Sequence, residues 1–181
     1  MIFQGKVHVY YGDGKGKTTA AVGLAVRAFG AGFDVLAAQF LKDGRSPEMN
    51  VLRDQLKIPV YAEKMTPKMS YAMTEDEKEQ SRASHEKVWQ AAMDWAASSG
   101  LQLYAGRLLV LDEVLGAIES GLFPEGKLID FLDHRPADLE VVITGRNPSA
   151  QILERADYRS RISCDGHPFN NGTGARKGIE F

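Results

Sequence analysis

The sequence has 181 residues, of which 44% are hydrophobic and 25% are charged, with a formal net charge of −2 at pH 7. These values are typical of one α/β domain with a substantial core, and the small net charge argues against a protein that coats nucleic acid. Cys164 is the single cysteine, which excludes an internal disulfide and favours a reducing, cytoplasmic setting. No signal peptide or membrane-spanning run is evident, so we expect no membrane partner.

A glycine-rich loop follows the first predicted strand, residues 7–11, and precedes a helical pattern at 18–31. Glycine lets successive backbone N–H groups point at one anion, and the helix adds the positive end of its dipole. The usual phosphate loop has glycine five positions before Gly16, where this chain has Tyr11. The loop predicts nucleoside triphosphate binding, and a simple strand-to-helix turn is the alternative. We expect its residues Gly12, Asp13, Gly14, Lys15, Gly16, Lys17, Thr18 and Thr19 to bind phosphate.

Further strands and helices alternate along the chain. Residues 35–40, 60–62, 108–111, 141–144 and 158–164 are predicted strands, and residues 47–56, 74–99, 114–120, 124–133 and 149–156 are predicted helices. Thr74 and Glu77 form a capping box at the start of the longest helix. The alternation predicts a mostly parallel sheet with helices on both faces, a three-layer P-loop NTPase (RecA-like) fold, as a single domain over residues 1–181.

Charged residues follow two of the predicted strands, at the sheet edge where ligands of such folds bind. Asp112 and Glu113 directly follow the apolar run 108–111. With Thr18 and a triphosphate they suit Mg²⁺, although a helix start facing water is the alternative. Arg146 follows the strand at 141–144 and is a candidate phosphate ligand or a surface ion-pair residue. Arg27, further along the first helix, is a weaker candidate.

The segment 63–73 is a predicted loop that nevertheless carries apolar residues. Its Met65, Met69, Tyr71 and Met73 either form an adaptable binding surface or cover the core, and both readings stay open. The histidines do not form a metal cluster. We interpret His8, His85 and His134 as surface or packing residues.

Four stretches together resemble the P-loop-type corrinoid adenosyltransferases, which act on cob(I)alamin or cob(I)yrinic acid a,c-diamide. They are residues 12–21, 111–113, 142–146 and the tail 167–181, which ends in Ala-Arg-Lys-Gly-Ile-Glu-Phe. The resemblance implies that a Co(I) corrinoid attacks the 5′ carbon of ATP and that intact triphosphate leaves. It implies catalytic roles for Lys17, Thr18 and Glu113, and a Mg²⁺ or Mn²⁺ ion on Thr18, Asp112 and Glu113.

The same resemblance implies partners. The substrate would be cobalamin or a cobinamide-type corrinoid, contacted by Met69 and Tyr71, and a reducing flavoprotein would supply Co(I). A homodimer is expected, without nucleic acid. Family members carry an N-terminal helical lid over the corrinoid. Because this chain starts eleven residues before Gly12, we expect that lid to be absent or supplied by another element.

Other classes stay open from the residues themselves. A P-loop ATPase or kinase would carry the usual first glycine, and a non-catalytic ATP-binding module would bind nucleotide without turnover. A nucleic-acid motor is disfavoured, because the sequence has no basic track interleaved with aromatic residues.

Overall fold

A computed structural model describes residues 3–64, 68–98 and 106–179. Within these residues the centre is a six-stranded parallel sheet in the order β3-β2-β4-β5-β1-β6. This confirms the α/β fold expected from the sequence. The strands are β1 (Val7–Tyr11), β2 (Asp34–Gln39), β3 (Val60–Tyr61), β4 (Arg107–Asp112), β5 (Leu139–Thr144) and β6 (Tyr158–Arg161).

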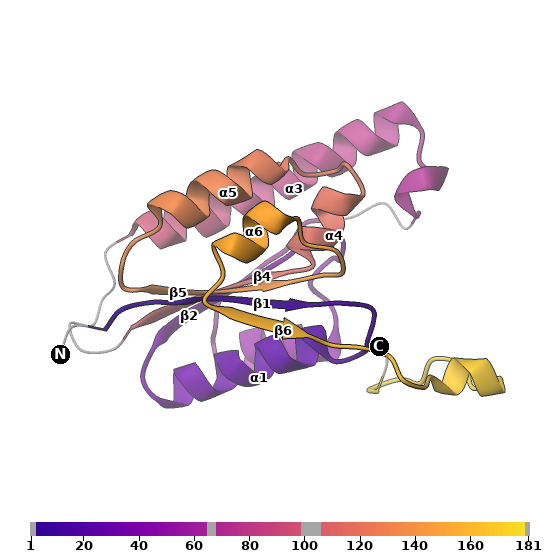
Figure 1. Ribbon diagram of the computed structural model, residues 1–181, viewed down its shortest axis with the longest axis horizontal. Helices are drawn as coiled ribbons and strands as arrows, with labels where there is room; N and C mark the ends of the chain where they lie inside the picture. Colours follow the sequence, from indigo (N-terminus) through magenta and orange to yellow (C-terminus); the bar gives the residue numbers. More distant parts are fainter. Residues whose placement is uncertain (1–2, 65–67, 99–105, 180–181) are drawn as a thin grey trace.

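Helices cover both faces of the sheet (Figure 1). One face carries α1 (Lys17–Gly30) together with α2 (Pro47–Asn50), which continues as a π-helical segment, Val51–Gln55. The other face carries α3 (Glu75–Ala97), α4 (Val114–Glu119), α5 (Glu125–His134) and α6 (Ala150–Glu154). The described residues contain no helix long and apolar enough to cross a membrane.

Two hydrophobic cores lie on opposite faces of the sheet, and β4 contributes to both. Leu108 and Val110 pack in the core beside α1, whereas Leu109 and Leu111 pack in the core beneath α3 and α5. Successive strand residues point to opposite faces, so a strand buried on both sides needs an unbroken apolar run. This explains why the run predicted a central strand.

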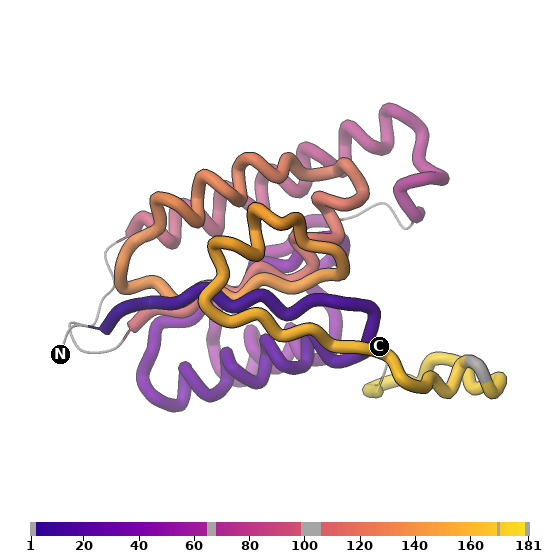
Figure 2. Tube along the Cα trace, in the orientation of Figure 1, coloured from indigo at the N-terminus to yellow at the C-terminus, as the bar shows by residue number. Residues whose placement is uncertain are grey.

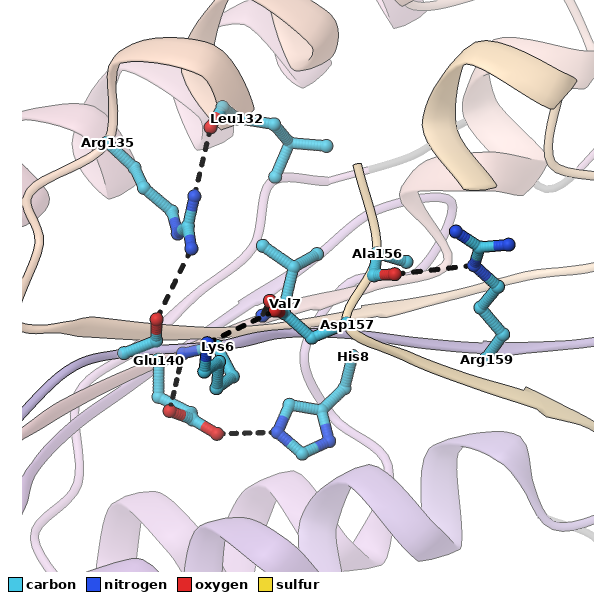
Figure 3. Close-up of polar contacts among 10 residues, drawn as sticks. Lys6, Val7, His8, Leu132, Arg135, Glu140, Ala156, Asp157 and Arg159 are labelled. Atoms are coloured by element: carbon cyan, nitrogen blue, oxygen red, sulfur yellow. Dashed lines mark hydrogen bonds and ion pairs between the residues drawn. The ribbon is translucent and has the colours of Figure 1, made fainter. Parts of the chain in front are cut away.

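Carboxylates join the amino ends of the strands (Figure 3). The backbone N–H of Lys6 donates to Glu140 Oε2 at 2.8 Å, and that of Val7 donates to Asp157 Oδ2 at 2.9 Å. His8 Nε2 meets the other oxygen of Glu140. These contacts fix β1 between β5 and β6 at the edge opposite the glycine-rich loop, so their role is structural.

The structure confirms one predicted element boundary and corrects another. Thr74 and Glu77 form the expected reciprocal capping box at the start of α3. The strand predicted over 158–164 is too long, because β6 ends at Arg161. Its partner β1 ends at Tyr11, opposite Arg161, where the chain curls into the loop. Beyond β6 the chain leaves the two helical layers and lies at the carboxyl edge of the sheet (Figure 2).

Candidate functional site

The glycine-rich loop is held by the segments that follow β5 and β6, the strands on either side of β1. The N–H of Gly12 donates to the Arg146 carbonyl at 3.0 Å, and the N–H of Gly14 donates to the Ile162 carbonyl at 2.9 Å. Gly12 and Gly16 have φ values of 110° and 113°, a backbone conformation that residues with a Cβ atom rarely adopt. The loop therefore has a fixed path, set by the segment after β5 on one side and the segment after β6 on the other.

Close packing adds a second requirement for glycine. A Cβ atom at Gly12 would lie 2.5 Å from the Ile162 carbonyl oxygen, and one at Gly14 would lie 2.6 Å from that of Ser163. Nothing lies within 4 Å of the corresponding position at Gly16, where α1 begins. The loop is thus crowded on the side of the β6 extension and open at the start of the helix.

Lys17 is the first residue of α1 and lies over the loop. Its Nζ donates to the Gly14 carbonyl at 2.7 Å, and only 9% of the residue is exposed. Burial lowers the pKa of Lys17, an effect that nearby Glu113 opposes and nearby Arg146 strengthens. An ammonium group in such a place gains by neutralising an anion, because burial makes its isolated charge costly.

Asp112 ends β4 and is fully buried. Its Oδ1 accepts hydrogen bonds from the hydroxyls of Thr18 and Thr144, both at 2.8 Å. Its Oδ2 accepts from Gln39 Nε2 at 2.9 Å. Gln39 is also fully buried, and its Oε1 has no hydrogen-bond partner among the described residues. The carboxylate therefore ties the start of α1 to the ends of β2 and β5.

Glu113 follows Asp112 but has a different environment. Its φ of 59° is left-handed, its backbone N–H donates to Thr144 Oγ1 at 2.8 Å, and it precedes α4. Burial raises the pKa of Glu113, and Asp112 raises it further. No described residue hydrogen-bonds its carboxylate. Left-handed non-glycine residues cost free energy and concentrate at functional sites, so Glu113 is a candidate on backbone grounds as well.

A cavity of about 540 Å³ adjoins this carboxylate. Glu113 and Arg146 line its side nearest the loop, and Met69 lies in its wall. Tyr71 is 87% exposed and is not a lining residue, while Met65 lies outside the described residues. Further apolar and polar lining is supplied by Leu41, Met73, His85, Gly116, Glu119 and Leu122.

Of the remaining candidate residues, three lie at the loop and one lies far from it. Asp13, Lys15 and Thr19 are exposed on the loop and first turn of α1. Arg27 is exposed in the last turn of α1, ten residues beyond Lys17 and so about 15 Å along the axis. The structure therefore does not bring Arg27 to the loop.

Sequence reasoning missed the residues that support the acidic pair. Thr144 lies within the stretch 142–146, whose charged residue, Arg146, carries the more obvious signal of ligand binding. Gln39 is a polar residue at the end of an apolar strand, which is a usable signal, since a buried amide needs partners. Its pairing with Asp112 depends on the order of the strands, which the sequence does not display.

The fold and the glycine-rich loop define the class of protein to which this chain belongs. A parallel sheet, a glycine-rich loop between β1 and α1, and a buried Asp112 bonded to Thr18 make this a P-loop NTPase-like protein. Residues 3–181 match the family described as ATP:corrinoid adenosyltransferase BtuR/CobO/CobP. The chain belongs to this family, which confirms the resemblance seen in the sequence.

Named relatives agree with the family assignment. The chain is 34% identical to the corrinoid adenosyltransferase of Escherichia coli strain K12, over 98% of this chain and 86% of the relative. It is 33% identical, with the same coverage, to corrinoid adenosyltransferase CobA of Salmonella typhimurium. It is 29% identical to the corrinoid adenosyltransferase of Pseudomonas aeruginosa, over 98% of this chain and 84% of that protein.

Proposed function

We propose that this chain transfers the 5′-deoxyadenosyl group of ATP to the Co(I) centre of a corrinoid and releases triphosphate. Family membership supports the reaction. The observation that carries the proposal is the meeting of two features at Glu113 and Arg146: the glycine-rich loop and the cavity of about 540 Å³. One suits a triphosphate, and the other offers apolar walls to a second substrate.

The reaction sets definite tasks for the residues. Cobalt supplies the electron pair of the new Co–C bond, and the breaking C5′–O bond leaves its electrons on the triphosphate. The loop amides and Lys17 would stabilise that charge. The remaining task is to hold C5′ in line with cobalt, because positioning lowers the barrier of a bimolecular step. The described residues therefore need to supply no side-chain nucleophile.

The oxygen atoms beside the loop fit Mg²⁺ or Mn²⁺. Thr18, Asp112 and Glu113 offer one hydroxyl and two carboxylates, the oxygen ligands that such cations prefer. The described residues contain no group of three His, Cys, Asp or Glu side chains able to hold a metal. Mg²⁺ commonly takes one or two carboxylates beside phosphate and water, and Asp112 and Glu113 supply two. When bound there, the ion would neutralise charge on the leaving triphosphate.

The cavity would take part of the corrinoid. Leu41, Met69, Met73 and Leu122 give it apolar walls, which favour a flat hydrophobic ring system and exclude water. Exclusion of water and of a lower axial ligand would make Co(II) easier to reduce. Met69 is the stronger contact candidate. Tyr71 would contribute only if its exposed ring closed over bound substrate.

The decisive experiment is anaerobic incubation with ATP, Mg²⁺ and chemically reduced cobalamin. We expect a light-sensitive cobalt–carbon product together with an equal amount of inorganic triphosphate. Stoichiometric ADP with no alkylated corrinoid would refute the proposal and indicate a P-loop ATPase. Tight ATP binding without any product would indicate a non-catalytic module.

A matched pair of variants tests the acidic residue. Glu113→Gln should abolish most Mg²⁺-dependent turnover while the protein stays folded. Glu119→Gln is the control, because Glu119 lines the same cavity but its carboxylate is held by a hydrogen bond from Asn147. If Glu113→Gln keeps Mg²⁺-dependent turnover as high as that of the wild type and of Glu119→Gln, a metal role for Glu113 is excluded.

Four further proposals follow from the sequence and from the family resemblance. They are a single domain over residues 1–181, a homodimer, a cytoplasmic location and a flavoprotein as the reductant. Sedimentation measures the oligomeric state. Replacing the chemical reductant with a reduced flavoprotein tests the last proposal, since turnover from Co(II) should then continue.

A further inference from the structure

The hydrogen bonds of His85 define one tautomer. The residue is fully buried in α3, where Nδ1 lies 2.6 Å from the Ser81 carbonyl oxygen. Nε2 lies 3.2 Å from the backbone nitrogen of Leu41, beyond the end of β2. A carbonyl can only accept and an amide N–H can only donate, so Nδ1 carries the proton and Nε2 is the acceptor. The imidazole is neutral, and burial lowers its pKa accordingly.

The partner of His85 has a strained backbone. Leu41 has a φ of 59°, a left-handed conformation that is uncommon for a branched side chain. Such a conformation persists where surrounding contacts fix it. The hydrogen bond from the Leu41 N–H to His85 is one such contact, and Phe40 stacks on the imidazole with ring centroids 5.7 Å apart.

Leu41 in turn forms part of the cavity wall. A Cβ atom added at Gly116 of α4 would lie 2.9 Å from Leu41 Cδ1 and 3.1 Å from Glu113 Oε2. The leucine side chain therefore rests against α4 beside the Glu113 carboxylate. Leu41, His85 and Glu113 all line the same cavity.

We infer that His85 is a positioning residue that acts through Leu41 to shape the substrate cavity beside Glu113. Its acceptor nitrogen holds the left-handed turn after β2, and that turn sets the leucine against Gly116. The inference rests on the proposed function where it assigns this cavity to the corrinoid. The loop that would bind ATP is held by other contacts, so the effect should be specific to one substrate.

The test compares His85→Leu, which keeps bulk but removes the acceptor, with His85→Gln. A glutamine amide offers an acceptor oxygen beside a donor NH₂ group, so it can replace the acceptor nitrogen and the N–H of the neutral imidazole. We expect His85→Leu to raise KM for the corrinoid about tenfold, or about 1.4 kcal/mol. KM for ATP should stay within about twofold, and His85→Gln should restore most of the affinity. His134→Leu, at an exposed histidine of α5, is the control.

A double-mutant cycle identifies the route of the effect. If His85 acts through Leu41, His85→Leu should add little to KM in a Leu41→Ala background. Independent, multiplying effects of the two substitutions would overturn the inference. So would an unchanged KM for the corrinoid in folded His85→Leu, or a parallel rise for both substrates.

A measurement on the free protein separates this inference from the proposed reaction. Nitrogen-15 NMR should show His85 protonated at Nδ1 alone, and His85→Gln should shift the Leu41 amide signal. Protonation at Nε2 overturns the inference even where His85→Leu fails to fold. Absence of adenosylation by the wild type would instead count against the proposed function and leave this result standing.

Discussion

Substitution of Asp112 separates the charge of this carboxylate from its hydrogen bonds. Asp112 accepts from Thr18, Thr144 and Gln39. The asparagine side chain of the Asp112→Asn variant would keep an oxygen for the two threonine hydroxyls but would face Gln39 with an NH₂ group. The unpartnered Oε1 of Gln39 could accept from that group after the glutamine amide flips. We therefore expect Asp112→Asn to preserve the network, whereas Asp112→Ala removes the acceptor of all three donors.

The expected magnitudes differ enough to measure. A buried donor without a partner costs about 1–3 kcal/mol. Three such donors would cost about 3–9 kcal/mol, and the threonine hydroxyls can rotate, so we expect about 3 kcal/mol for Asp112→Ala. For a chain of this size that lowers Tm by about 6–12 °C. Asp112→Asn should stay within about 1 kcal/mol, or about 4 °C, because it keeps the bonds and removes a buried charge.

Thermal unfolding of both variants, followed by circular dichroism, gives the comparison, and Mg²⁺-dependent turnover is measured on the same samples. Asp112→Asn should lose most turnover while keeping its Tm, because the metal needs a charged ligand. An equal fall in Tm for the two variants would refute the flip. The control is Asp112→Asn with Gln39→Leu, which removes the amide that must flip and should have a lower Tm than Asp112→Asn alone, because the asparagine NH₂ group is then left without an acceptor.

Other expectations follow from the same geometry. Gly14→Ala places a Cβ 2.6 Å from a backbone oxygen and should abolish ATP binding, which calorimetry measures. Gly23 lies within α1 with open space around its Cβ position, so Gly23→Ala should raise the free energy of unfolding by up to about 1 kcal/mol, which thermal unfolding measures. Because burial lowers the pKa of His85, the unfolded chain takes up a proton at this histidine at a higher pH than the folded chain does. The free energy of unfolding should thus decline below about pH 6.5 more steeply in the wild type than in His85→Gln, by urea denaturation. Met69→Ala should slow turnover from Co(II) more than turnover from Co(I), and Tyr71→Ala should do so only if its exposed ring closes on substrate.

The elements that the sequence predicted well carry local signals. The apolar run at 108–111 can be buried on both faces only in a central strand, and Thr74 with Glu77 specifies a helix start within four residues. The glycine-rich loop is equally local, because strand, glycines, Lys17 and helix are consecutive. The predicted end of the last strand failed because it depends on a partner, β1, which lies about 150 residues earlier in the chain and ends at Tyr11.

The sequence predicted that Thr18 and the acidic pair lie at one edge of the sheet, and Thr18 does donate to Asp112 there, but it did not predict the residues that support the pair. The contact of Gln39 with Asp112 exists because β2 lies beside β4 rather than beside β1. The link from His85 to Leu41 joins a helix to a strand end 44 positions away. Neither leaves a periodic or spaced pattern, so only the fold displays them.

The adjacent carboxylates show how backbone geometry divides what the sequence presents as one motif. Asp112 still belongs to β4, and its oxygens are taken up by three donors, including Thr18 at the start of α1. Glu113 leaves the strand in a left-handed conformation and lies in the wall of the cavity, with no described hydrogen bond to its carboxylate. In an extended strand, consecutive side chains would have pointed to opposite faces, one of them into the core beneath α3 and α5. The turn at Glu113 instead keeps the second charge at the sheet edge, between the loop and the cavity. Glu113 therefore lies beside both Lys17 and the cavity, the two places to which the proposed function assigns its substrates.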